Sequence, residues 1–84
     1  TISDYQGRIA ELARDSIADT PKEKRDISTL TMALDSNQIQ KIRDILAETR
    51  KAIVNVVNAM PAQICDSVYQ LNFQLFPMMK KEER

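Results

Sequence analysis

The sequence predicts a small α+β domain with the element order α-β-α-β, built in two layers. Two observations lead to this prediction. Apolar residues recur every three to four positions in two stretches, as on one face of a helix, and alternate with polar residues in two others, as on a strand. With 84 residues, 43% of them hydrophobic and 29% charged, the chain has a globular composition and the length of a single domain, 1–84.

The first predicted element is a helix over residues 4–18. Ser3 and Gln6 fit a capping box at its start, in which each side chain bonds the backbone N–H of the other residue. Thr20-Pro21 ends the helix, because the residue before a proline avoids helical dihedral angles. The apolar face consists of Ile2, Tyr5, Ile9, Leu12, Ala13, Ser16 and Ile17.

The second predicted element is a strand from Asp26 to Leu34. Its side chains alternate, with Leu30, Met32 and Leu34 on one side. The other side carries Ile27, Thr29, Thr31 and Ala33. Threonine is common in strands, so this composition favours the extended conformation.

A long helix over residues 36–59 is the third element. Asp35 and Gln38 have the spacing of a capping box, and Pro61 marks the end of the helix. Its apolar positions follow helical spacing: Ile39, Ile42, Leu46, Thr49, Ile53, Val56 and Met60.

The last predicted element is a strand over residues 68–76, which ends at Pro77. Tyr69, Leu71, Phe73 and Leu75 share one face. Gln70, Asn72 and Gln74 share the other. The polar stretch 80–84 is expected to form a frayed tail.

The long helix fixes the expected topology. It spans about 36 Å, enough to return the chain beside a strand of about 30 Å, so the two strands would be parallel and both helices would cover one sheet face. Two strands leave unpaired edges, which a second copy of the domain would complete by dimerisation. A strand from elsewhere in a longer parent chain would serve as well.

Composition excludes several functions. The chain has no histidine, the usual general base and metal ligand, and one glycine, too few for a phosphate-binding loop. We expect no enzymatic activity, cofactor or metal. Lysine plus arginine equal aspartate plus glutamate at 12 each, so we expect no direct contact with nucleic acid. The chain also lacks an apolar run that could span a membrane, and cytoplasmic residence is expected.

Single residues with reactive side chains are interpreted as structural. Cys65 is the one cysteine, and we expect a small buried apolar side chain, as is usual for a free cysteine. A reactive thiol is not expected, because the charged neighbour Asp66 opposes thiolate formation. Tyr69 is expected in the core, with its hydroxyl bonded at the rim. Met32 and Met60 are interpreted as core filler. Since Thr1 is not an initiator methionine, the chain is expected to be part of a longer polypeptide.

Two motifs resemble a known family. Arg25-Asp26-Ile27-Ser28-Thr29-Leu30-Thr31 and residues 68–77, Val-Tyr-Gln-Leu-Asn-Phe-Gln-Leu-Phe-Pro, resemble the C-terminal domain, of unknown function, of a Fibrobacter-type paralogous family of bacterial transcriptional regulators. The likeness covers nearly the whole chain, and family members look like proteins with an upstream helix-turn-helix. The resemblance implies a C-terminal dimerisation or regulatory domain, with the DNA-binding domain earlier in the same chain.

Five polar residues form the candidate partner or ligand face. They are Thr29 and Thr31 on the first predicted strand and Gln70, Asn72 and Gln74 on the second. Such a polar stripe is commonly the solvated side of a sheet. Alternatively, its amides and hydroxyls would meet a partner surface or a polar ligand. Val68 and Phe76 at the ends of this face favour an interface.

Arg25 and Asp26 form the candidate interface clamp. They lie at the start of the first predicted strand, where a surface turn is the ordinary interpretation. The alternative is an ion pair or hydrogen-bonded clamp across a homodimer.

Two functional classes therefore follow from the sequence. The first is a non-catalytic dimerisation or regulatory domain of a transcriptional regulator, which would set the spacing of two DNA-binding domains. The second is a small-molecule sensor that binds its ligand at the polar sheet face or the dimer seam.

Overall fold

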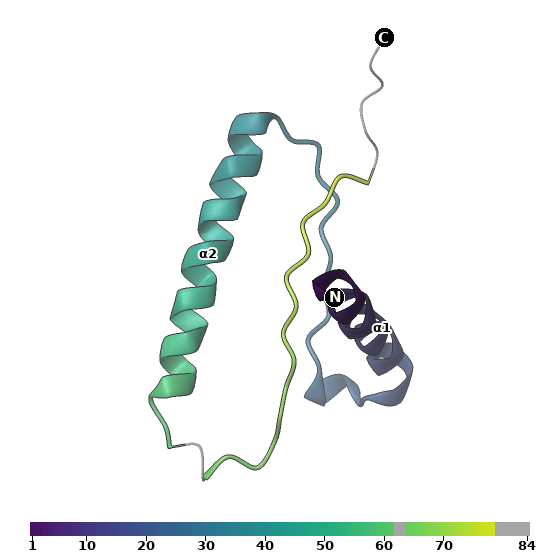
Figure 1. The fold of residues 1–84 in the computed structure, drawn as a ribbon, viewed down its shortest axis with the longest axis vertical. Coiled ribbons are helices and arrows are strands. Elements are labelled where there is room, and N and C mark those ends of the chain that lie inside the picture. Colours follow the sequence, from purple (N-terminus) through teal and green to yellow (C-terminus); the bar gives the residue numbers. More distant parts are fainter. Residues whose placement is uncertain (62–63, 79–84) are drawn as a thin grey trace. The chain divides into compact units, whose positions relative to one another are not determined.

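The computed structural model describes residues 1–61 and 64–78, and the chain divides into two compact units, Thr1–Leu34 and Asp35–Arg84. The first unit contains helix α1 (Ile2–Asp19) and a 3₁₀ turn, η1 (Lys22–Lys24). The second contains helix α2 (Ser36–Asn58). Figure 1 shows these helices and the non-helical segments that follow each of them.

Helix α1 begins at Ile2, two residues before the predicted start, and Thr1 is its N-cap. The Thr1 hydroxyl accepts from the backbone N–H of Asp4 at 3.2 Å and donates to the Asp4 carboxylate at 3.0 Å. The Thr1 amino group donates to the same carboxylate at 3.4 Å, which completes a capping box. The predicted box of Ser3 and Gln6 is therefore wrong, because the equivalent pair two residues earlier caps the helix instead.

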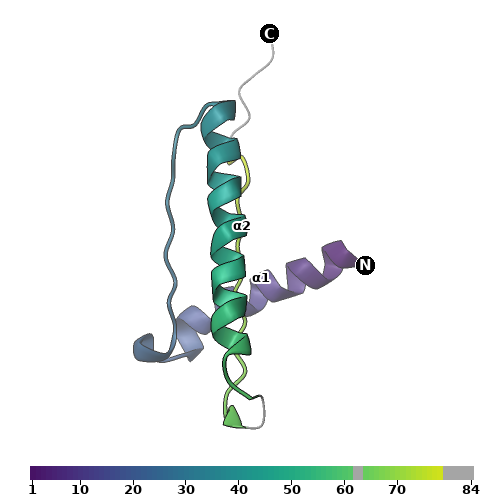
Figure 2. The same cartoon turned by 90° about the vertical axis from the view of Figure 1, so that its left-hand side faces the viewer.

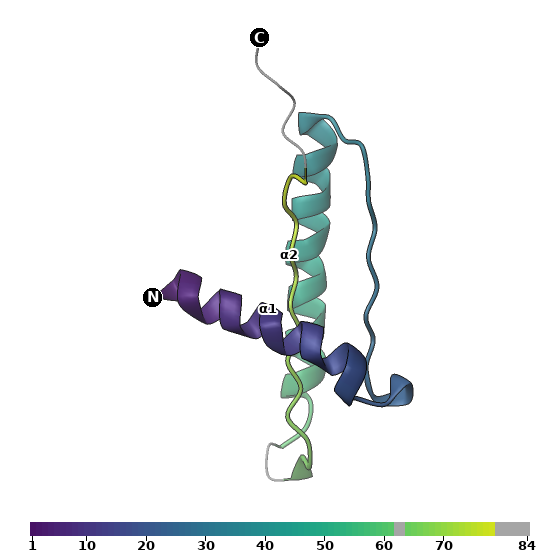
Figure 3. The same ribbon diagram turned by 90° about the vertical axis from the view of Figure 1, so that its right-hand side faces the viewer.

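The end of α1 lies where proline was expected to stop it. The backbone N–H of Thr20 donates to the Ser16 carbonyl at 2.9 Å, and Thr20 itself is extended. After η1, the Arg25 Nε donates to the Thr20 carbonyl at 3.0 Å. A guanidinium here is favourable because the last carbonyls of a helix carry partial negative charge. Figure 3 shows α1 and the turn that follows it.

Helix α2 confirms the helix predicted over residues 36–59 and ends one residue earlier, at Asn58. The Gln38 backbone N–H donates to the Asp35 carboxylate at 2.8 Å, and the Asp35 N–H donates to the Gln38 side chain at 3.1 Å. The predicted capping box is thus present. Figure 2 shows α2 as one continuous helix.

The predicted strands are wrong: residues 26–34 and 68–76 are neither helix nor strand, and the described residues contain no sheet. Alternation places side chains on two sides of an extended chain, but a strand also needs a neighbouring backbone to pair its N–H and C=O groups. The α-β-α-β, two-layer α+β fold and the sheet completed by dimerisation are therefore not supported. The predicted tail over residues 80–84 lies outside the described residues.

No described residue is buried. The least exposed side chains reach an intermediate level, among them Ile9 in α1, Ile42 and Leu46 in α2, and Phe73 after it. The predicted core of apolar side chains between helices and a sheet is therefore wrong. Without a sheet as second layer, the apolar faces of both helices stay accessible to water.

Candidate functional site

The candidate partner face does not lie on a sheet, but part of it is held together. The Gln70 Nε2 donates to the Asn72 Oδ1 at 3.1 Å, so these two amides lie on the same side of their segment, as alternation predicts. Asn72 is half-buried, while Gln70 and Gln74 are exposed. An amide of this kind keeps further donors and acceptors for another molecule.

Thr29 and Thr31 lie in the other unit of the chain. Both are exposed, in the non-helical segment that follows η1. Among the described residues neither threonine hydroxyl takes part in a hydrogen bond. The interpretation of the five polar residues as one binding face, for a partner or a ligand, stays a prediction.

Arg25 of the candidate clamp is engaged within its own unit. Its bond to the Thr20 carbonyl holds the half-buried guanidinium at the end of α1. Asp26 is exposed, and in residues 1–61 and 64–78 neither residue forms an ion pair. A local role for Arg25 is therefore visible, and the clamp between two copies stays a prediction.

One contact escaped the sequence-based prediction. After α2 the chain reverses direction (Figure 1), and the guanidinium carbon of Arg50 lies 5.6 Å from the centroid of the Phe73 ring. A cation over an aromatic face is attracted by the ring's negative charge density. Nothing in the local pattern pairs these residues, because they are far apart in the sequence and the predicted strand assigned Phe73 to a core.

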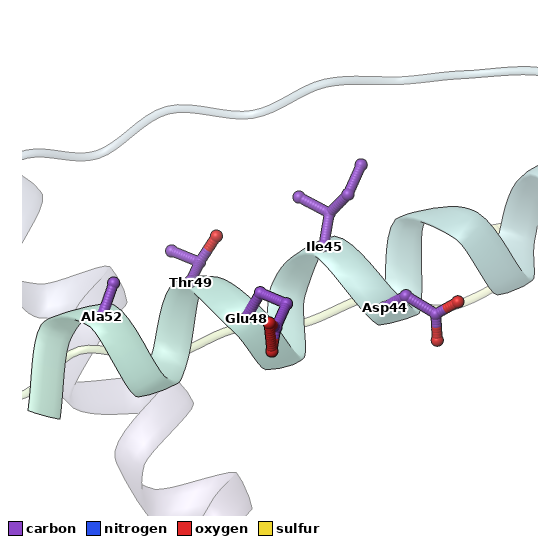
Figure 4. A pocket seen from close by; sticks show the side chains of 5 residues that line it. All are labelled: Asp44, Ile45, Glu48, Thr49 and Ala52. Carbon is purple, nitrogen blue, oxygen red and sulfur yellow. The ribbon is translucent and has the colours of Figure 1, made fainter.

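The pocket described by the structure is an open surface on α2. Ile45, Thr49 and Ala52 point to one side of the helix, beside Asp44 and Glu48 (Figure 4). Asp44 accepts a hydrogen bond from Gln40 at 2.9 Å, and Glu48 pairs with Lys51 at 3.3 Å. All five lining residues come from one helix, so the surface resembles a docking face more than a cavity for a small molecule.

The apolar row of α1 is the other exposed surface of note. Ile2, Tyr5, Ile9, Leu12 and Ser16 follow one another at alternating spacings of three and four residues, and we call this row the α1 seam. Ile2 is 79% exposed, Tyr5 61% and Leu12 52%, while Ile9 and Ser16 are half-buried. The spacing is that of side chains that pack between two helices.

Two residues predicted to be buried are exposed. Tyr69 is 71% exposed, and the Cys65 thiol is exposed and lies 3.7 Å from the Pro61 carbonyl oxygen. Met32 and Met60, predicted as core filler, are also exposed. Tyr69, Met32 and Met60 were assigned to a core that the described structure lacks, and burial of Cys65 was expected only from the usual behaviour of free cysteines.

The described residues contain no cluster of cysteine, aspartate and glutamate that could hold a metal ion. The expectation of no enzymatic activity stays a prediction.

None of the helices that the structure describes combines the length and apolar character needed to cross a membrane.

The described residues include two capped amphipathic helices, one in each unit, and both have exposed apolar residues. The chain belongs to the family described as Domain of unknown function (DUF4423), which matches residues 1–78. No curated protein and no solved structure matches the chain.

Proposed function

We propose that this domain is a non-catalytic dimerisation or regulatory domain, C-terminal in a bacterial transcriptional regulator of the cytoplasm, whose DNA-binding domain lies upstream in the same chain. The observation that carries the proposal is the pair of capped helices with solvent-exposed apolar faces. Apolar faces that are exposed to solvent are typical of surfaces that bind another protein.

The charge balance supports protein association over direct DNA binding. The 12 basic and 12 acidic residues give no net positive charge, and net positive charge supplies most non-specific affinity for DNA. A regulator in which one domain reads DNA and another joins two copies places two readers on neighbouring half-sites. The resemblance of residues 25–31 and 68–77 to regulator C-terminal domains points the same way.

A fusion experiment tests the proposal. The chain is joined behind a monomeric helix-turn-helix DNA-binding domain, and binding to DNA with one or two half-sites is measured by gel shift. We expect the fusion to bind two half-sites cooperatively. The unfused reader should bind them without cooperativity, and the chain alone should not bind DNA. A fusion that binds two half-sites no better than the unfused reader would refute the dimerisation role.

A further inference from the structure

The charges beside the α1 seam have a specific arrangement. Arg8 and Asp15 each come three residues after one seam residue and directly before the next, so they flank the same side of the seam one heptad apart. Gln6 and Ala13 flank the other side. One edge of the exposed row therefore carries a positive and a negative charge, and the opposite edge carries none.

We propose that α1 pairs in antiparallel orientation with α1 of a second copy of this chain, with Ile9 opposite the partner's Leu12. This rests on the proposed dimerisation function and assigns it to a face. In such a pair the flanking residues of one edge meet their equivalents. Arg8 then lies beside the partner's Asp15, and Asp15 beside the partner's Arg8.

The same charges select the register. Sliding the pair by one heptad in one direction places Arg8 beside the partner's Arg8, and sliding it in the other places Asp15 beside the partner's Asp15. A parallel pair places Arg8 beside the partner's Ala13 and gains no ion pair. Like charges across an interface disfavour the wrong arrangements, so the pattern specifies one alignment.

The contacts that Arg8 and Asp15 make within their own chain do not prevent an ion pair with the partner helix. The Arg14 Nε lies 3.7 Å from the Asp15 Oδ1, and both side chains are largely exposed. An exposed ion pair at this distance contributes little, so Asp15 can turn toward a closer partner at small cost. Arg8 forms no ion pair within the part of the chain that the structure describes.

Helix α2 also carries a row of residues at alternating spacings of three and four, which includes Ile42, Leu46 and Thr49. The charged residues that flank this row all have the same sign. Arg43 and Arg50 come directly after the row residues Ile42 and Thr49, on the same edge. An antiparallel pair of α2 helices would place these arginines beside each other, and no acidic residue flanks the row to offset them. The charges thus favour α1 over α2 as the face that meets an identical helix.

The test is the association of the chain by sedimentation equilibrium, with helix content followed by circular dichroism. Asp15→Arg turns both ion pairs into repulsive contacts, and we expect association about tenfold weaker or more. It does not weaken α1 itself, because the new arginine lies four residues from Glu11 and from Asp19. Glu11→Arg is the matched control: it makes the same charge change at a position that does not flank the seam, two residues after Ile9, and association should stay within about twofold.

The double variant Arg8→Asp/Asp15→Arg exchanges the two charges and should regain most of the association that Asp15→Arg loses. The pairing is wrong if Asp15→Arg associates as tightly as the native chain. It is also wrong if the double variant stays as weak as Asp15→Arg while its helix content is native. A native chain that remains monomeric at all concentrations refutes the dimerisation function itself, whereas a dimer insensitive to these charges refutes the α1 face alone.

Discussion

Helices α1 and α2 start in the same way and differ in charge. Each begins at a capping box, and each carries an exposed apolar row with spacings of three and four residues. Helix α1 contains four acidic and two basic residues, and α2 contains four basic and two acidic ones. Although the whole chain has no net charge, α1 therefore has a net negative charge and α2 a net positive charge. The charges beside each apolar row decide which surface that row can bind.

The largest expected effect is a loss of dimer affinity when a side chain of the α1 seam is removed, compared with one elsewhere on α1. Leu12→Ala removes a seam side chain that is 52% exposed, and we expect the dimer to lose about 2 kcal/mol, summed over both copies, or roughly 30-fold in affinity. Ile17→Ala is the control, because Ile17 is 54% exposed but lies next to the seam and outside it. Sedimentation equilibrium compares the two, and equal weakening by both would contradict a defined seam.

The start of α2 gives the next effect. Asp35→Ala removes the side chain that accepts the Gln38 N–H at 2.8 Å, and we expect α2 to lose about 1 kcal/mol of stability. Asp35→Asn keeps an acceptor of equal capping strength and should retain the helix. Thermal unfolding followed by circular dichroism measures both, and an unchanged midpoint for the alanine variant would show that the cap is dispensable.

A stabilising change is expected in α1. Gly7 has a negative φ and no atom within 4 Å of the position that a Cβ would occupy. Gly7→Ala should therefore stabilise α1 by about 0.5–1 kcal/mol, because alanine loses less backbone entropy in a helix. Ala10→Gly makes the reverse change about one turn later and should lower the helix content. A loss of helix in Gly7→Ala would mean that this position meets another surface.

The smallest effect concerns the contact between α2 and the segment that follows it. A double-mutant cycle removes the cation by Arg50→Gln and the ring by Phe73→Leu, singly and together. We expect a coupling free energy of unfolding of about 0.5 kcal/mol, typical of an exposed cation–π pair. The same cycle with Arg43→Gln in place of Arg50→Gln should give none. Denaturant unfolding supplies the free energies, and equal coupling in both cycles would contradict the specific contact.

The helices were predictable because their signals are local. Asp35 and Gln38 lie within one turn, and the bonds that they form need nothing outside that turn. Local signals can also compete: Ser3 and Gln6 fit the same motif as Thr1 and Asp4, and the pattern alone does not say which pair caps α1. The error there was two residues at the start of a correctly predicted helix.

The strands could not be derived in the same way. Alternation from Tyr69 to Leu75 describes an extended chain, and the Gln70–Asn72 bond agrees with it, yet pairing depends on a second segment that local patterns do not supply. The candidate functional site also contains one feature with a local sequence signal and one without. Two neighbouring amides of the candidate face are in contact, whereas the interaction of Arg50 with Phe73 joins distant residues and has no signal in either neighbourhood.

Cys65 has a practical consequence. It is the one cysteine of the chain, and its thiol is exposed. A thiol-reactive fluorophore can therefore be attached at a single known position without any substitution. Mixing donor-labelled and acceptor-labelled chains would report subunit exchange by energy transfer. The rate of that exchange would give the lifetime of the complex, which an equilibrium measurement of affinity does not.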